Sequence, residues 1–327
     1  MKHISILVPE GDCSLSNIEG CHQIFSEVNS FLTKRGQRPI FEIQLVGIRR
    51  ENRMKKGLFS IHPDVLTSEV TKTDLIIIPA IQGRMKDALA MNQEFVPWLV
   101  AQYKQGAALA SLCIGSFLLA STGLLDGKKC ATHWLSANDF RSKFPKVNLV
   151  TDQIITDENG IYSSGGAYSS LNLVLYLVEK FAGREMAVLS SKVFQIEIDR
   201  NSQSAFMIFN GQKDHDDEPV KKAQEYIEQN FQEKMTVDQL ASMFALGRRN
   251  FERRFKKATA NTVIEYMQRV KIEAAKMSLE SSRENVNEVI YNIGYSDPKA
   301  FRTTFKKITG LSPLQYRSKY YREAQVA

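Results

Sequence analysis

The chain has 327 residues, two to three times the usual length of a domain, so we expect two domains. Hydrophobic residues make up 43% and charged residues 24%, which excludes long-range disorder, collagen and coiled coils. The net charge of +7 is unevenly spread: residues 1–211 carry 22 basic and 20 acidic side chains, whereas residues 236–327 carry 17 and 9. This basic C-terminal third indicates an anionic partner, and nucleic acid is a better candidate than a membrane.

The cysteines and the N-terminus indicate the compartment. Four cysteines are too few for a disulfide scaffold in a chain of this length, and neither their spacing nor a histidine partner resembles a zinc site. The N-terminal apolar run is broken by Pro9 and Glu10, and no run approaches the roughly 18 residues of a membrane span. We therefore expect a cytoplasmic protein with reduced thiols, no membrane partner, no metal and no cofactor.

Strands and helices alternate over residues 4–181. The apolar and β-branched runs predict strands at 4–8, 41–46, 74–79, 107–112 and 161–164. Helical patterns lie between and after them, at 20–35, 94–105, 114–122 and 168–181. The run at 74–79 is almost entirely apolar, as expected of a central parallel strand covered on both faces. The alternation predicts an α/β domain with a doubly wound, flavodoxin-like parallel sheet.

The pattern changes after residue 211. Residues 212–219 lack apolar side chains and end in proline, so we interpret them as a linker. Only helical periodicity follows. The predicted organisation is therefore an α/β domain at 1–211, a linker at 212–219 and an all-α domain at 220–327.

The helical part contains an internal repeat. FERRFKKAT at 251–259 recurs as FRTTFKKIT at 301–309, and Tyr266 likewise matches Tyr316. Phe-x-x-x-Phe alone is ordinary core spacing on an amphipathic helix. Chance does not easily give the same phenylalanines, lysines, threonine and tyrosine in one register, so we interpret the repeat as two copies of one structural unit.

Each copy follows a shorter helix and a turn containing glycine. Thr236 and Gln239 have the form of a capping box, and the turn before Arg248 contains Gly247. In the second copy a cap at Asn285 is followed by a turn at 294–296. A helix, a short turn and a basic helix form a helix-turn-helix unit, here present twice. The apolar stripe at 263–279 predicts one long helix that holds the two units apart.

Helix geometry separates core positions from candidate DNA contacts. The two phenylalanines of each copy share the buried face, and the basic residues lie about 100–200° away on the helix, as its 3.6-residue turn dictates. Arginine pairs bidentately with guanine, and lysine and arginine also contact phosphates. A plain solvated charge remains the alternative for any single residue. The candidate base contacts are Arg249, Arg253 and Lys256 in the first copy and Lys299, Arg302, Thr303 and Lys306 in the second; Arg248 begins the first of these helices, and Arg254, Lys257 and Lys307 are candidate phosphate contacts.

These residues carry a resemblance to a known family. GYSDPKAFRTTFKKITGLSPLQYR at 294–317 closely resembles the signature of AraC/XylS-family transcription regulators, and the resemblance extends over about residues 220–322. It implies two helix-turn-helix units that enter successive major grooves of double-stranded DNA. A homodimer and a contact with RNA polymerase are further expectations. The chain departs from the family at Gly247, where a serine cap is usual, but glycine is an acceptable cap.

A cysteine in the α/β domain stands where enzymes place a nucleophile. Cys113 joins an apolar strand directly to a helix, a turn that exposes a side chain at the carboxyl edge of a sheet and favours a thiolate. Gly115 would allow close backbone approach. His133, beside Trp134, is the best candidate base among the five histidines. The alternative for Cys113 is a small buried apolar residue.

The surrounding sequence resembles the PfpI-like, class I glutamine-amidotransferase-like superfamily. The resemblance lies in ASLCIGSFLLASTGLLDGKKCATHW at 110–134 and SSGGA at 163–167, and the segment at 203–206 resembles the GlxA-type subgroup of AraC regulators. Catalytic members pair the cysteine with a carboxylate and often with a following histidine. This chain has Leu15 and Ile114 at those positions, although Glu10 or Glu19 remains an alternative acid. Asn17 and Asn172 stand where the subgroup commonly has aspartate.

We therefore interpret the α/β domain as an enzyme fold retained as a ligand pocket. Open α/β sheets bind ligands at the carboxyl ends of their strands, where backbone amides favour a small anion. The family implies a small, often nitrogen-containing metabolite. The alternatives are a Cys113-dependent amidase or hydratase-like enzyme fused to a DNA-binding module, and a purely architectural DNA-binding protein. The expected effector-binding residues are Asn17, Cys113, Ile114, His133, Trp134, Gly165 and Gly166.

Overall fold

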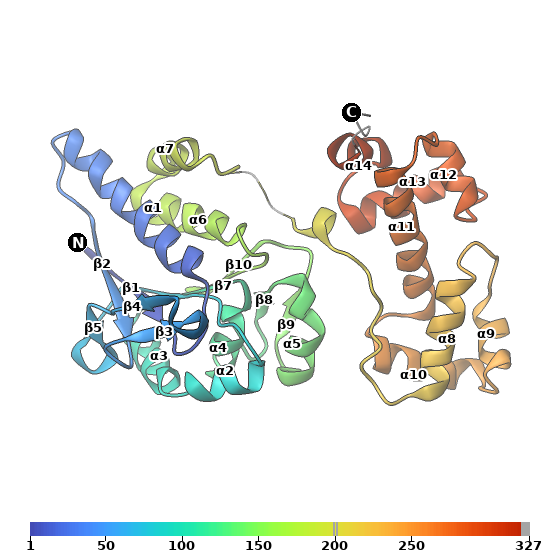
Figure 1. The fold of residues 1–327 in the computed structure, drawn as a ribbon, viewed down its shortest axis with the longest axis horizontal. Helices are drawn as coiled ribbons and strands as arrows, with labels where there is room; N and C mark the ends of the chain where they lie inside the picture. Colours follow the sequence, from blue (N-terminus) through green and yellow to red (C-terminus); the bar gives the residue numbers. More distant parts are fainter. Residues whose placement is uncertain (199, 201, 322–327) are drawn as a thin grey trace. The chain divides into compact units, whose positions relative to one another are not determined.

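The computed structural model describes residues 1–198, 200 and 202–321 (Figure 1). The chain divides into two compact units, one ending at Gln203 and the other beginning at Ser204. Each unit is described by itself below.

The first unit is built on a seven-stranded sheet. Its five central strands run in the order β2–β1–β6–β7–β11, all parallel, which is the flavodoxin-like order. Short β5 extends one edge, and β10 adds an antiparallel strand at the other. The sheet strands are β1 Lys2–Val8, β2 Phe41–Gly47, β5 Val65–Leu66, β6 Leu75–Ile78, β7 Ala108–Leu112, β10 Ile155–Glu158 and β11 Ile161–Ser164; the two small sheets pair β3 Asn52–Met54 with β4 Phe59–Ile61 and β8 Lys129–Ala131 with β9 Asn148–Val150.

Helices cover both faces of this sheet (Figure 1). Leu75 and Ile77 of β6 point into the core shared with α1, α6 and α7, and Ile76 and Ile78 point into the core shared with α2–α5. Burial on both faces explains the continuous apolar run and confirms the doubly wound prediction. The helices are α1 Leu15–Lys34, α2 Met85–Met91, α3 Phe95–Lys104, α4 Ser116–Ser121, α5 Ala137–Lys143, α6 Ser170–Ala182 and α7 Arg184–Phe194, with 3₁₀ turns η1 Lys55–Gly57, η2 Thr67–Glu69, η3 Cys113–Gly115 and η4 Trp134–Ser136.

The first helix begins earlier than the sequence predicted. We expected it to start at Gly20, but α1 starts at Leu15 and Gly20 lies inside it. A Cβ on Gly20 would lie 3.0 Å from the Leu171 side chain of α6. The glycine therefore marks close helix packing and not a helix start. The short elements β3–β5, β8–β10, α2 and α5, and the longer α7, were not predicted from the sequence.

Helices are the regular secondary structure of the described part of the second unit, which contains no strand there, as predicted. Its segment 212–219 is not a free linker, because Asp217 caps α8 and the two following residues form the first turn of that helix. Gln224 also donates to the carbonyl of Gln212 and contacts His215. The helices are η5 Ser204–Phe206, α8 Glu218–Gln229, α9 Val237–Met243, α10 Arg248–Thr259, α11 Val263–Ser281, α12 Val286–Asn292, α13 Pro298–Thr309 and α14 Pro313–Tyr320.

The sequence repeat is also a repeat of packing. In the first copy the rings of Phe255 and Tyr266 meet edge to face with centroids 5.3 Å apart, and in the second Phe305 and Tyr316 meet at 5.5 Å. All four rings are buried. The predicted capping boxes at Thr236 and Asn285 are both present, and two unpredicted ones begin α11 and α14.

The two copies differ at the end of their basic helices. Ala260 has a left-handed conformation with φ 56°, where the second copy has Gly310 with φ 76°. We predict that Ala260→Gly raises the free energy of unfolding by about 0.5–1 kcal/mol, because glycine adopts this conformation without a Cβ penalty.

Chemical denaturation followed by circular dichroism would measure this change. Both tryptophans lie in the first unit, so tryptophan fluorescence should report an unchanged transition there. Ala258→Gly within α10 is the matched control and should destabilise by about 1 kcal/mol. Equal destabilisation by both variants would contradict the prediction.

Candidate functional site

The basic faces of α10 and α13 are the candidate DNA interface. The two helices start fifty residues apart, have the same length, and bury the phenylalanine face of each copy. Their opposite faces are exposed. The exposed side chains at the expected DNA-contacting positions are Arg248, Arg249, Arg253, Lys256 and Lys257 on α10 and Lys299, Arg302, Thr303, Lys306 and Lys307 on α13.

Arg254 has a different environment from the other candidates. Its guanidinium donates two hydrogen bonds to the carboxylate of Asp217, at 2.8 and 2.7 Å, and its side chain is only 29% exposed. The ion pair lowers the pKa of Asp217. Arg254 therefore fixes α10 to the start of α8, and its contact with a phosphate stays a prediction.

Several exposed candidates have partners on the protein surface. Arg248 pairs with Asp238 at 2.9 Å, and Arg302 donates to Asn287 at 3.0 Å. An exposed ion pair such as Arg248–Asp238 contributes little free energy, and the bond from Arg302 to the neutral Asn287 is also exposed, so both arginines can exchange these partners for DNA.

A lysine that the sequence analysis did not single out holds the second turn. Lys271 of α11 donates to the carbonyls of Ile293 and Gly294, at 3.2 and 3.3 Å, just after α12. Its burial lowers its pKa. A Cβ on Gly294 would lie 1.9 Å from the carbonyl oxygen of Gln232, in the loop after α8. The turn of the second helix-turn-helix is thus held against α11 and the loop after α8.

In the first unit, Cys113 lies on the predicted sharp turn between β7 and α4. Its φ of 55° is left-handed, a strained conformation for a residue with a side chain. A Cβ on Gly115 would lie 2.4 Å from the carbonyl oxygen of Ile78 and 2.5 Å from that of Pro79. Gly115 therefore allows the turn to sit directly against the end of β6, as a nucleophile elbow requires.

The environment of Cys113 keeps its thiol protonated. Burial raises the pKa of this thiol to about 11, although a hydrogen bond from the amide of Ile114 acts in the opposite direction. No carboxylate contributes to this shift in the described part of the chain: Glu10 pairs with Arg49 at 3.7 Å, and Glu19 is exposed on α1. The Ile114 side chain packs into the apolar core behind the elbow.

His133 serves a structural role beside the elbow. Its Nδ1 accepts a hydrogen bond from the amide of Leu135 at 3.2 Å, and its ring lies against half-buried Trp134. Burial lowers the pKa of His133. The residue that touches the elbow is its neighbour Thr132, whose hydroxyl donates to the carbonyl of Cys113 and accepts from Ser116.

The glycine turn after β11 is also held against Thr132. A Cβ on Gly165 would lie 2.8 Å from the carbonyl oxygen of Thr132 and 2.3 Å from Nε2 of Gln203. Gly166 follows with a left-handed φ of 78°. Cys113, Thr132, Gly165 and Gln203 therefore form one cluster at the carboxyl edge of the sheet. Only the resemblance had drawn attention to Gln203.

Asn17 and Asn172 are buried and already hydrogen-bonded. Asn17 accepts from the amide of Ala80 at 3.2 Å and donates to Ser170 at 3.0 Å, which ties α1 to the end of β6 and to α6. Asn172 donates to the carbonyl of Glu197. Both amides fix the framework around the elbow, and effector contact by Asn17 stays a prediction.

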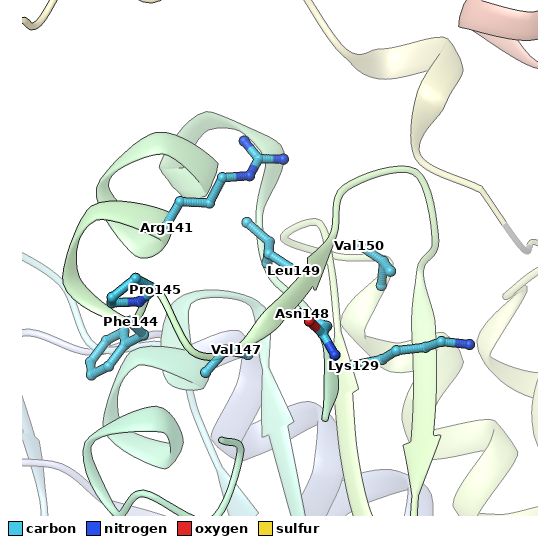
Figure 2. A pocket seen from close by; sticks show the side chains of 8 residues that line it. All are labelled: Lys129, Arg141, Phe144, Pro145, Val147, Asn148, Leu149 and Val150. Atoms are coloured by element: carbon cyan, nitrogen blue, oxygen red, sulfur yellow. The ribbon is translucent and has the colours of Figure 1, made fainter. Parts of the chain in front are cut away.

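A separate hollow lies beside β8, β9 and α5. It has a volume of about 550 Å³, and Figure 2 shows Arg141 on the helix and Lys129 on the strand among its lining side chains. It contains no expected effector-binding residue.

Within the described ranges, no group of three His, Cys, Asp or Glu side chains is placed to hold a metal ion. None of the described helices is long and apolar enough to span a membrane.

Each of the two units matches a known protein family or domain. Residues 30–180 match the DJ-1/PfpI family, and residues 240–319 match a helix-turn-helix domain. A solved putative transcriptional regulator from Vibrio parahaemolyticus superposes with a TM-score of 0.53 at 23% identity, over 59% of this chain and 98% of that one. At this identity the likeness shows the fold.

Three curated proteins are similar to different shares of the chain. The transcriptional regulator GbdR of Pseudomonas aeruginosa is 29% identical over 79% of this chain and 69% of its own length. The regulator GlxA of Rhizobium meliloti is 21% identical over 64% of each chain. Isonitrile hydratase of Pseudomonas putida is 25% identical over 39% of this chain and 54% of its own. The chain is therefore similar over most of its length to helix-turn-helix transcriptional regulators, with a DJ-1/PfpI-family match in its first unit and a helix-turn-helix match in its second.

Proposed function

We propose that this protein is a sequence-specific transcription regulator that binds double-stranded DNA through α10 and α13. The observation that carries the proposal is the pair of matching helices, each with a buried aromatic face and an exposed basic face, in one compact unit. Recognition helices of helix-turn-helix proteins present this kind of surface to the major groove. We also propose a cytoplasmic location, which a DNA partner supports.

The DJ-1/PfpI-like unit would bind a small-molecule effector and mediate dimerisation. The cluster around Cys113 and Gly165 supports an effector site at this position, because loops and helix N-termini gather at the carboxyl edge of such a sheet. Backbone amides at this edge suit a small anionic group. Cys113, His133, Trp134, Gly165 and Gly166 remain the residues that we expect around the ligand.

An enzyme that uses Cys113 is the second candidate function. The relationship to isonitrile hydratase and the elbow geometry favour it. A thiol with a raised pKa is a poor nucleophile at neutral pH, because the thiolate is the reactive species. We therefore propose that the elbow is retained for ligand binding and has no catalytic activity.

The DNA proposal predicts two kinds of variant. Arg249→Ala and Arg302→Ala should weaken binding to a specific fragment by about 1–3 kcal/mol and relax sequence preference, because each would remove a base contact. Lys257→Ala should weaken binding to all sequences about equally. It should also reduce the slope of log K against log salt concentration by roughly one, because one phosphate contact is lost. Mobility-shift assays of the full chain on genomic fragments, repeated over a salt series, would measure both.

Lys192→Ala on α7 is the control for these assays. It removes a basic side chain from the first unit and should leave DNA binding unchanged. Binding that depends on salt but is equal for every fragment would contradict specific regulation and favour an architectural role.

The raised pKa of Cys113 predicts how fast it reacts. Alkylation of Cys113 by iodoacetamide should increase about tenfold for each pH unit from pH 7 to pH 10, because the thiolate fraction follows the pKa of about 11. Mass spectrometry of the labelled peptide, with Cys113→Ser to identify the adduct, would follow the reaction. A plateau below pH 9 would indicate an activated thiolate and favour the enzyme.

Cys113→Ser separates regulation from catalysis. We expect no turnover of amide or isonitrile substrates by either form, since the thiol lacks an acid or base partner. Target-gene control should persist, because serine keeps a small side chain on the turn. A reporter-gene assay beside a substrate assay would measure the two properties, and loss of both would make catalysis part of sensing.

A further inference from the structure

The second unit begins with a segment that crosses from one helix-turn-helix to the other. Residues 204–212 form this segment, which we call the strap. The unit has two apolar cores, one around Phe251 and Phe255 and the other around Phe301 and Phe305, and α11 contributes to both. Each core fixes one of the two basic helices. The separation of α10 and α13 therefore depends on what joins the cores.

The start of the strap is bound to the helices of the second core. The carbonyl of Ala205 accepts from the hydroxyl of Tyr320 at 3.1 Å, and the ring of Phe206 meets that of Tyr320 edge to face with centroids 6.4 Å apart. A Cβ on Gly310, just after α13, would lie 4.0 Å from the Cβ of Ser204. The strap is thus in contact with α14 and with the end of α13.

The end of the strap is bound to the first core. The ring of Phe209 meets that of Tyr266 edge to face with centroids 5.1 Å apart. The carbonyl of Gln212 accepts from the side chain of Gln224 at 2.9 Å, and the side-chain oxygen of Gln212 accepts from Asn261 at 3.1 Å. The strap therefore reaches α8 and the turn that follows α10.

A buried ion pair on α11 holds the middle of the strap. Lys276 is 4% exposed, donates to the carbonyl of Met207, and pairs with Glu273 at 2.8 Å. The same oxygen of Glu273 accepts from the amide of Phe209 at 3.1 Å. Removing one member of such a pair leaves the other as an uncompensated charge in a poorly hydrated place. We call Lys276 and Glu273 the latch.

The strap lies on the opposite side of α11 from the loop after α8. Lys271 faces that loop, with which it lines a hollow of about 320 Å³, and it holds the turn before α13. Glu273 is two positions further along, which is about 200° around an α-helix, and it faces the strap. Connections on both sides of α11 resist rocking of one core against the other in both directions.

We propose that the strap, held by the latch, sets the separation and angle of α10 and α13 and thereby determines which spacing of DNA half-sites the protein accepts. Lys276 and Glu273 are positioning residues, because they act through the two basic helices and contact no base. The DNA part of this proposal rests on the proposed function. The positioning part concerns the protein alone and is tested without DNA.

A distance measurement in the full chain tests the positioning part. Asn250→Cys and Ala300→Cys place spin labels at equivalent exposed sites on α10 and α13, and the four native cysteines are buried. Pulsed electron–electron double resonance, with labelled chains diluted in unlabelled protein, gives the distribution of the label separation. We expect a narrow distribution with the intact latch and one about twice as wide in Lys276→Met, because methionine fills the space but donates no hydrogen bond.

Three further variants separate positioning from folding. Glu273→Leu combined with Lys276→Met removes the latch without leaving an unpaired charge and should broaden the distribution in the same way. Lys276→Arg retains a charged donor and should restore the narrow distribution. Tyr316→Phe is the structural control: it removes the bond to Glu280 inside the second core but keeps the ring, so it should lower stability without broadening the distribution.

Half-site spacing tests the DNA part. A fragment that the wild type binds specifically is altered by inserting or deleting one base pair between its half-sites, a change of about 3.4 Å and a tenth of a turn. We expect wild type and Lys276→Arg to bind the altered fragments about tenfold more weakly than the original, and Lys276→Met about threefold or less. The ratio of affinities is the readout, because simple loss of folded protein weakens binding to every fragment equally.

Each result decides one part of the proposal. Distributions of equal width in wild type and both latch variants would overturn the positioning part, and an unchanged spacing ratio in Lys276→Met would overturn the DNA part. Binding by the wild type that is equal for every fragment would contradict the proposed function and, with it, the DNA part. The distance measurement would still decide whether the strap positions the two helices.

Discussion

The burial of two phenylalanines and a tyrosine in each repeat is the constraint on which the DNA-binding unit depends. Because Phe251 and Phe255 are fully buried on one face of α10, Arg253, Lys256 and Lys257 point away from the core and are exposed. Phe301 and Phe305 are buried in the same way, so the basic face of α13 also points away from its core. The basic surface is therefore a consequence of how the core is filled, and the two surfaces are alike because the cores are alike.

A different constraint governs the first unit. Gly115 brings the turn at Cys113 against the backbone at the end of β6, and this contact holds the cysteine in its left-handed conformation. An enzyme would combine this geometry with a charged partner that stabilises a thiolate. Here burial has the larger influence and the thiol stays neutral. The fold thus has the shape of a nucleophile elbow, and no charged partner of the thiol lies among the described residues, which supports the proposed binding role.

The sequence predicted those features that depend on the pattern of nearby residues. The repeat, its capping boxes and the nearly all-apolar run at 74–79 follow from residues a few positions apart, and the structure confirms them, with the strand itself at Leu75–Ile78. The features that were missed depend on partners distant in the chain. Arg254 meets Asp217 and Gln203 meets Thr132 only after folding, across 37 and 71 positions. Gly20 shows the same limit, since its role is set by Leu171 on another helix.

The differences between the two repeats carry as much information as their likeness. Arg253 of α10 corresponds to Thr303 of α13, and Glu252 corresponds to Arg302. These positions lie on or beside the outward face, where direct readout depends on the identity of each side chain. Identical recognition helices would favour a repeated base sequence. Helices that share a core but differ at these positions would instead favour two unlike half-sites, and the contacts of Lys271 and Gly294 hold the second turn against α11 and the loop after α8.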